Sequence, residues 1–216
     1  MFKGFLALDK TVFPPKPNAI RSGEWERMCA KNGATPFCDI NPEYWQQFYR
    51  DNRDGLFILV DNSTGNIIGS LCANFISDTH KDGYINGFVD FEQITKATPT
   101  VGGSNNLLIS NMALLQEHRN KDGIKALGAG LVNWLSSLAE QGIKPNYAFA
   151  EAGSSDGANS LTRGFGMVPI DKDDLDFDGG GMYHSPDALQ SYIAKMKTWQ
   201  VNKIATQGDD PVIKYN

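Results

Sequence analysis

Apolar residues recur along this chain at the two spacings that distinguish strands from helices. Alternating or continuous apolar runs, bounded by Gly, Asn, Asp and Pro, predict strands at residues 56–60, 67–76, 107–115, 146–151, 167–170 and 181–184. The first two flank a polar turn at residues 61–66, where Gly65 is expected in the left-handed conformation. They predict a β-hairpin, and the last two predict a second pair of strands.

A helical stripe follows the third of these strands, formed by Leu127, Leu131, Trp134, Leu135 and Leu138. Gly142 is expected to end that helix. Further helices are expected at residues 24–30, 42–50 and 154–163. A last helix is expected to start at Ser185, with Pro186 at its first position and with Leu189, Ile193, Met196 and Trp199 facing inward.

The order of these elements predicts a single mixed α/β domain. No internal repeat or inter-domain linker interrupts the chain. Residues 1–40 form an N-terminal extension, and residues 185–216 form a C-terminal helix and tail. Residues 77–105 read as a long polar connection with one apolar island, 84–91; connections of this length tend to be functional, and we expect a lid over a substrate site.

The most informative segment is the strand, turn and helix between residues 106 and 142. The strand passes into a polar stretch, 116–122, and then into a glycine-studded turn, 123–130, before the helix. Glycines let a ligand approach the backbone, and the unpaired N–H groups and dipole of a helix N-terminus favour an anion. The segment therefore predicts a phosphate or coenzyme site.

Composition narrows the class of protein further. The 216 residues carry a formal charge of −5, which argues against general nucleic-acid binding and is compatible with a cationic substrate. Cys29, Cys38 and Cys72 are scattered without metal or disulfide spacing. No signal peptide or membrane span is recognisable, so a soluble cytoplasmic protein is expected.

Two motifs resemble the GCN5-related N-acetyltransferase (GNAT) superfamily. Residues 112–127 are similar to its strand, glycine turn and helix, and residues 155–167 to its downstream helix motif, where Ala158, Leu161 and Gly166 match. The glycine turn departs from the usual pattern and allows three registers. The first has Arg119 as the basic residue and Gly123 and Ile124 as anchor, the second spans 120–125, and the third spans 125–130. We favour the first.

The resemblance implies a mostly antiparallel, twisted central sheet flanked by helices, with two strands splayed to admit acetyl-CoA as cosubstrate. The pantetheine arm would pair with the strand at Met112, Ala113 and Leu114, and a backbone N–H near Leu114 would stabilise the oxyanion. The pyrophosphate would lie on the turn, whose expected contact residues are Arg119, Asn120, Lys121, Asp122, Gly123, Ile124, Lys125 and Ala126. The implied reaction is direct acetyl transfer to a primary amine.

Such a transfer needs a base for the amine and an acid for the departing thiolate. Glu151, at the end of its strand, is the first candidate base, followed by Asp90 and Glu92, and then by His184. The superfamily's usual tyrosine acid is replaced by Thr162. Ser155 or Tyr183 would substitute for it, or the thiolate leaves unassisted.

Other interpretations stay open beside this one. A catalytically inactive acyl-CoA-binding or interaction module fits the missing tyrosine and the irregular glycine turn. Residues 174–179 match half of a calcium loop, although a solvated hairpin turn explains them as well. Trp45, Phe48 and Tyr49 line an acceptor pocket or pack in the core. The acceptor's identity and the oligomeric state are not determined by the sequence.

Overall fold

The computed structural model describes residues 53–89, 93–119, 122–172 and 180–206, together with Gln47 and Arg50. Its strands form a six-stranded sheet in the order β1-β2-β3-β4-β6-β5. Every neighbouring pair is antiparallel except β3 and β4, which are parallel. The bounds are β1 Leu56–Val60, β2 Ile67–Ile76, β3 Asn106–Leu114, β4 Tyr147–Ala152, β5 Val168–Pro169 and β6 Gly181–Ser185. The predicted mixed α/β fold with a mostly antiparallel sheet is confirmed.

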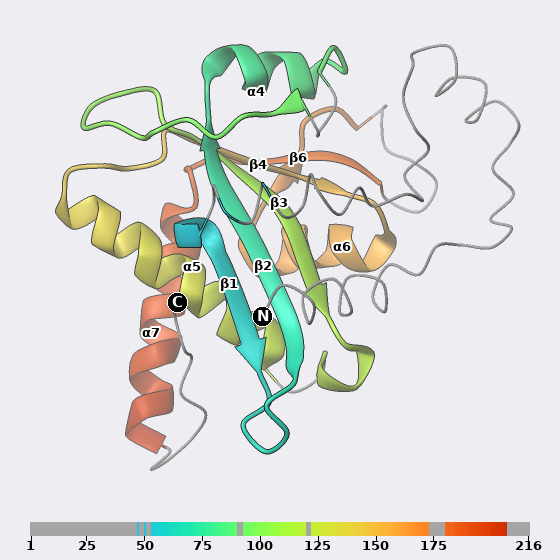
Figure 1. The fold of residues 1–216 in the computed structure, drawn as a ribbon, viewed down its shortest axis with the longest axis vertical. Helices are drawn as coiled ribbons and strands as arrows, with labels where there is room; N and C mark the ends of the chain where they lie inside the picture. Colours follow the sequence, from blue (N-terminus) through green and yellow to red (C-terminus); the bar gives the residue numbers. More distant parts are fainter. Residues whose placement is uncertain are drawn as a thin grey trace, which may run out of the picture.

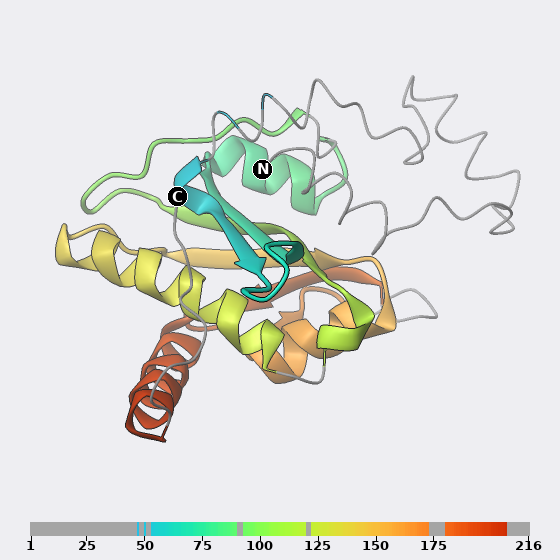
Figure 2. The same cartoon turned by 60° about the horizontal axis from the view of Figure 1, so that its bottom comes forward.

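Helices cover both faces of this sheet. The longer ones are α4 Asp78–Ile85, α5 Gly123–Glu140, α6 Ser155–Asn159, which continues as the π-helix η4 Ser160–Phe165, and α7 Gln190–Thr206; the 3-10 turns are η1 Arg53–Gly55 and η3 Gln116–His118. Figure 2 shows α5, α6 and α7 on one side of the sheet and α4 on the other. Two core clusters correspond to these two sides, a larger one beneath α5 and a smaller one beneath α4.

Successive residues of β4 point to opposite faces of the sheet, as the strand period of two requires. Ala148, Ala150 and Ala152 belong to the larger cluster, whereas Phe149 belongs to the smaller one and Tyr147 packs against it. The next residue on the α4 side is Glu151. The face on which each β4 side chain lies is therefore fixed by the pairing with β3 and β6.

The local turn predictions are confirmed. The hairpin pairs Leu56 with Cys72, and Gly65 has a φ of 72° in the turn. Gly142 follows the end of α5 with a φ of 79°. Each of these positions lies in the left-handed region that glycine adopts without a Cβ clash.

Three expectations about helices are corrected. Residues 123–130 are the first turns of α5 rather than a turn before it, because Gly128 and Gly130 let the helix approach Tyr192 and Phe57 too closely for a Cβ. Residues 77–105 contain the helix α4. The last helix begins at Gln190 and not at Ser185, because Ser185 pairs with Ala148 as the final residue of β6.

The inward face of α7 is as expected. Leu189 and Met196 are buried, and Ile193 and Trp199 pack against the larger cluster. The helix crosses α5, where the Gln200 side chain donates to Asn133 at 3.2 Å. In the part of the chain that the structure describes, no helix has the length and apolar character needed to cross a membrane.

Candidate functional site: the opening between β3 and β4

The parallel strands β3 and β4 separate partway along their length. Their ladder runs from the pair Asn106 and Tyr147 to the pair Ile109 and Ala150, and β3 continues to Leu114 beyond it. On the other edge of β3, the register with β2 shifts between Cys72 and Ala73, which leaves Ser110 as an extra residue, a β-bulge. A bulge bends a strand and increases its twist, and Figure 1 shows the two strands diverging.

The strand segment proposed for the pantetheine arm borders this opening. Met112 packs against the larger cluster, and Ala113 and Leu114 are buried, with Leu114 under the start of α5. Their partners on the β2 side are Leu71, Ser70 and Gly69. One edge of this segment is therefore fixed by β2, while the ladder to β4 no longer covers the other.

The N-terminus of α5 lies against the end of this segment, at Leu114, and has no side-chain cap among the described residues. Asp122 occupies the cap position with a φ of 58°, and its carboxylate accepts no hydrogen bond from the first-turn N–H groups. By contrast, Ser77 caps α4 and Ser154 caps α6. Helical hydrogen bonding in α5 starts with the N–H of Ala126 bonding to the carbonyl of Asp122. The N–H groups before it point out of the helix end.

Gly123 sets how closely α5 approaches β3. A Cβ on this residue would lie 2.9 Å from Leu114 Cδ2 and 3.1 Å from the carbonyl oxygen of His118. The favoured register, with Gly123 and Ile124 at the start of the helix, corresponds to this junction. The alternative at 125–130 lies inside α5.

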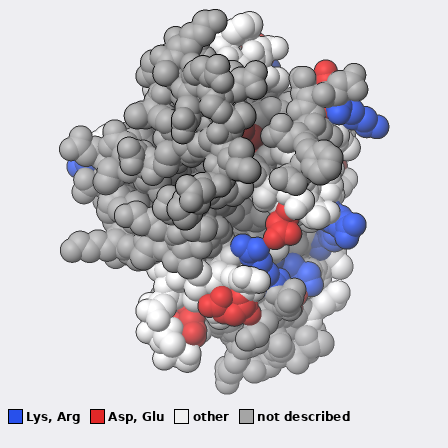
Figure 3. Space-filling view, turned by 90° about the vertical axis from the view of Figure 1, so that its right-hand side faces the viewer, with Lys and Arg blue, Asp and Glu red and all other residues white. Residues whose placement is uncertain are grey.

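Basic side chains flank the helix start, but each is held by an acidic neighbour. Lys125 Nζ lies 2.7 Å from Asp122 Oδ1, and Arg119 Nη1 lies 3.0 Å from Asp156 Oδ2. Arg119 Nε also donates to the carbonyl of Leu114 at 3.2 Å. On the side of the molecule toward which α6 lies, acidic and basic groups stand next to each other (Figure 3). Asn120 and Lys121 lie outside the described residues.

Glu151 lies at the end of β4, just beyond the last residue that pairs with β3. Its side chain is exposed on the α4 side of the sheet, and its Oε2 accepts a hydrogen bond from the hydroxyl of Tyr84. Tyr84 belongs to α4 and was not singled out from the sequence, except as the first residue of the apolar island 84–91. A hydrogen bond therefore links Glu151, the first candidate base, to the connection at residues 77–105.

The other predicted catalytic residues are divided between the two faces. Ser155 is exposed at the first position of α6, immediately after the β4 loop. Tyr183 is 3% exposed and lies in the larger core cluster, so it is on the opposite face from Glu151. His184 stacks on Tyr147 on the α4 side, with ring centroids 5.7 Å apart. Ser155 is therefore the more accessible of the two acid candidates.

Thr162 does not offer a free hydroxyl. Its Oγ1 donates to the carbonyl of Ala158 at 2.8 Å within the helix. Cys72, beside the bulge, is 1% exposed. A threonine hydroxyl bonded to its own helix and a buried thiol are both poorly placed to act as nucleophiles.

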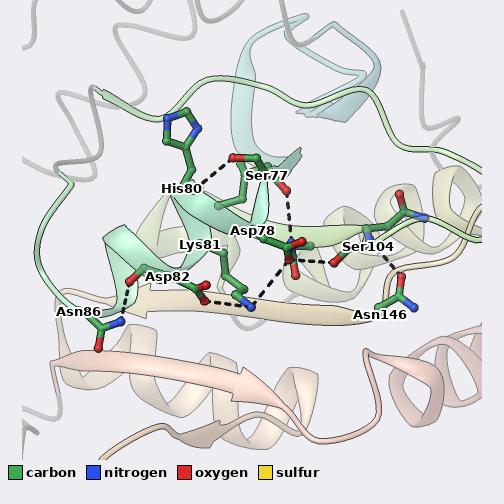
Figure 4. Close-up of polar contacts among 11 residues, drawn as sticks. Ser77, Asp78, His80, Lys81, Asp82, Asn86, Ser104 and Asn146 are labelled. Atoms are coloured by element: carbon green, nitrogen blue, oxygen red, sulfur yellow. Dashed lines mark hydrogen bonds and ion pairs between the residues drawn. The ribbon is translucent and has the colours of Figure 1, made fainter.

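The connection 77–105 is fixed to the sheet at several points (Figure 4). Asp78 Oδ1 accepts hydrogen bonds from Asn106 Nδ2 and Ser104 Oγ, both at 2.8 Å, which hold the pKa of this carboxyl below its usual value. Asn105 donates to Thr100 and Lys144 carbonyls, and the N–H of Ala97 bonds to the carbonyl of Phe75 at 2.7 Å. These hydrogen bonds attach the described part of the segment firmly to the sheet.

Several other candidates lie outside the described residues: Asp90 and Glu92 as bases, Trp45, Phe48 and Tyr49 as acceptor contacts, and the calcium-loop residues 174–179. Among the residues that are described, no three His, Cys, Asp or Glu side chains come together as a possible metal site.

No protein-family model matches the chain, and no curated protein matches it. Solved structures with a similar fold include a chain of the NatB acetyltransferase complex bound to a bisubstrate inhibitor, at 11% identity over 85% of this chain and 84% of that chain, with a TM-score of 0.49. Another is described as histone acetyltransferase HPA2 and related acetyltransferase from Corynebacterium glutamicum, at 16% identity over 86% and 91%, with a TM-score of 0.45. A third is the NatC complex bound to Gag peptide and CoA, at 13% identity over 77% and 89%, with a TM-score of 0.43. Two of these three structures are described as acetyltransferases.

Proposed function

We propose that this chain is an acyl-CoA-dependent N-acetyltransferase that transfers an acetyl group from acetyl-CoA directly to a primary amine. The observation that carries the proposal is the separation of β3 from β4 close to the N-terminus of α5, which has no side-chain cap among the described residues. An opening between parallel strands admits an extended thioester arm, and a free helix N-terminus binds the phosphates at its other end.

The coenzyme's contacts follow from this arrangement. The pantetheine arm lies along Met112, Ala113 and Leu114, whose edge toward β4 is not covered by the ladder. The pyrophosphate lies against the first turn of α5, at residues 122–126. Arg119 and Lys125 turn from Asp156 and Asp122 toward the phosphates.

The transfer then needs one proton acceptor on the amine side. Glu151 takes a proton from the ammonium, and the neutral amine attacks the thioester carbonyl carbon. Backbone N–H groups near Leu114 stabilise the oxyanion that forms. The carbon–sulfur bond breaks and the thiolate leaves with its electron pair. The amide nitrogen then loses its extra proton, which passes through Ser155 or water to the thiolate and gives CoA thiol. The acidic balance of the chain and the carboxylate at the site favour a cationic small amine as acceptor.

Calorimetric titration of acetyl-CoA into wild type and Lys125→Glu tests the coenzyme site. A glutamate in the first turn suits the helix dipole but repels the pyrophosphate, so binding falls at least tenfold without loss of the helix. The matched control is Lys144→Glu, the same charge change beyond the other end of α5, a helix about 27 Å long. Absence of binding by wild type, or equal loss in both variants, contradicts the proposal.

The second candidate is an acyl-CoA-binding module without turnover. It is favoured by Thr162, whose hydroxyl bonds to Ala158 instead of serving as an acid. Release of free CoA thiol with a panel of primary amines separates the two functions. Binding that persists with no thiol release from any amine supports the module.

A further inference from the structure

We infer that Tyr84, carried by α4, is a positioning residue that orients the Glu151 carboxylate toward the acceptor amine. The inference rests on the proposed function, because it assigns Tyr84 a role through the base of that reaction. The two residues are 67 positions apart in sequence and are joined by a hydrogen bond from the tyrosine hydroxyl to Glu151 Oε2.

The ring of Tyr84 is held by packing on the sheet. It contacts the smaller core cluster, whose buried members are Ile76, Ile94, Leu108 and Phe149. Its centroid lies 6.2 Å from that of Phe149, with the rings tilted by 50°. Phe149 and Glu151 are alternate residues of β4 and lie on the same face of the sheet. Because the Tyr84 ring packs on Phe149, its hydroxyl lies next to the Glu151 carboxylate.

The helix that carries Tyr84 is itself fixed. Ser77 caps its first turn, and Asp78 is bound by Asn106 of β3 and by Ser104. On its far side, the N–H of Phe88 bonds to the carbonyl of Gly83 at 2.7 Å and closes the turn after the helix. The Asp78 contacts thus hold the first turn of α4 against the sheet (Figure 4), and the packing of Tyr84 on Phe149 holds the ring near the other end of the helix.

The carboxylate of Glu151 has no other hydrogen-bond partner in the described part of the chain. An exposed glutamate rotates freely about its terminal torsion. A donor bound to Oε2 restricts that rotation and leaves Oε1 to accept the proton from the ammonium, which yields a neutral amine and a neutral carboxyl group. Tyr84 does not touch the reacting atoms, so its role is exerted through Glu151.

The kinetic test uses Tyr84→Phe, Glu151→Gln and the double variant. The assay is CoA thiol release with the fastest amine from a panel of putrescine, spermidine, agmatine and lysine. Phenylalanine keeps the ring packing and removes only the hydroxyl, so kcat falls about tenfold while the KM for acetyl-CoA stays the same. Glu151→Gln lowers kcat by at least about a hundredfold, and the double variant is no slower than Glu151→Gln. Tyr147→Phe, which removes a hydroxyl from the same face, is the matched control and keeps wild-type kcat.

A second measurement does not depend on finding the acceptor. Side-chain couplings and relaxation of Glu151, measured by NMR, report an ordered carboxylate arm in wild type and in Tyr147→Phe, and rotamer averaging in Tyr84→Phe. Equal mobility of Glu151 in all three proteins overturns the inference, as does an additive double variant. If Glu151→Gln retains full activity, the proposed base is wrong. If acetyl-CoA does not bind at all, the proposed function itself fails.

Discussion

The guanidinium of Arg119 lies 3.0 Å from Asp156 Oδ2, and this contact joins the segments that follow the two diverging strands. Arg119 comes after β3 and Asp156 stands in the first turn of α6, after β4. Nε of the same guanidinium donates a hydrogen bond to the carbonyl of Leu114, the last residue of β3. An ion pair therefore connects the two chain segments just past the point where β3 and β4 separate. A pyrophosphate bound there would compete with Asp156 for the Arg119 guanidinium.

Replacing the acidic partner is expected to favour the coenzyme. In Asp156→Asn the Arg119 side chain is released and a negative charge is removed near the phosphates, so acetyl-CoA binds about threefold more tightly. The pair is exposed, and the free energy of unfolding changes by less than about 1 kcal/mol. Calorimetry and urea unfolding check both values. Asp82→Asn, which breaks the Lys81 pair on the other face, is the control, and weaker coenzyme binding in Asp156→Asn contradicts this picture.

Two glycines in first helical turns should respond in opposite ways to alanine. In Gly123→Ala the new Cβ meets Leu114 and the His118 carbonyl, so unfolding becomes easier by about 1–3 kcal/mol. In Gly157→Ala the nearest atom is Ser154 Oγ at 3.4 Å, and the better helix former stabilises by about 0.5–1 kcal/mol. Denaturant midpoints compare the two. Equal effects would mean that α5 does not approach β3 as closely as the structure shows.

The link between α4 and the sheet is expected to depend on Asn106. This side chain is 2% exposed and donates to Asp78, so Asn106→Leu keeps the branching at Cγ and removes the hydrogen bond. We expect amide exchange in residues 78–85 to accelerate about tenfold through local opening, while the peptide from α5 is unchanged. Mass spectrometry of deuterium uptake measures both segments. Unchanged exchange in α4 would show that the apolar contacts alone hold it.

Tyr192 should make the protein less stable at alkaline pH. Burial raises the pKa of its hydroxyl, which packs against Gly128. In the unfolded chain the group ionises near pH 10, while the folded protein keeps it protonated above that pH. Below about pH 9 both states are protonated and the residue adds no pH dependence. As pH rises above about 10, the unfolded state gains by ionising, and stability falls by up to about 1.4 kcal/mol per pH unit from this group.

The comparison protein for that measurement is Tyr192→Phe. Its unfolding free energy should decline less steeply than that of wild type between pH 10 and 11.5, while the two profiles run parallel between pH 7 and 9. Guanidinium unfolding at a series of pH values gives both slopes. Parallel profiles throughout would place the hydroxyl in contact with solvent.

The parts of the fold that follow from local rules could be predicted from the sequence. The β1–β2 hairpin, β4 and the β5–β6 pair are apolar runs between turn residues, and Gly65 and Gly142 stand at left-handed positions. The start of α7 could not be placed in the same way. Ser185 and Pro186 have the residue types that favour a helix N-terminus. In the structure, however, Ser185 pairs with Ala148 as the last residue of β6, and the helix begins only at Gln190.

The features that were missed depend on contacts between distant residues. None of the residues of α4 is fully buried, so its sequence shows no apolar stripe. Its contacts with the sheet come from Tyr84 and Ile85, which pack against the smaller cluster, and from the Asp78–Asn106 hydrogen bond. Gly128 and Gly130 read as turn residues, yet they are required within a helix by Tyr192 and Phe57. Glu151 could be chosen as a candidate because it ends a strand. Its partner Tyr84 could not, because that pairing depends on where α4 lies over β4.

The extra residue at Ser110 has a consequence for how such an opening arises. On β2, Ala73 pairs with Ile109 and Cys72 pairs with Asn111, so Ser110 between them has no register partner. Because of this extra residue, Ile109 and Met112 face the same core although they are three positions apart. Deleting Ser110 would keep every later side chain on its present face and restore a regular ladder with β2. We therefore expect the deletion of this one residue to straighten β3 and to close the opening between β3 and β4 to ligands, while the core residues keep their places.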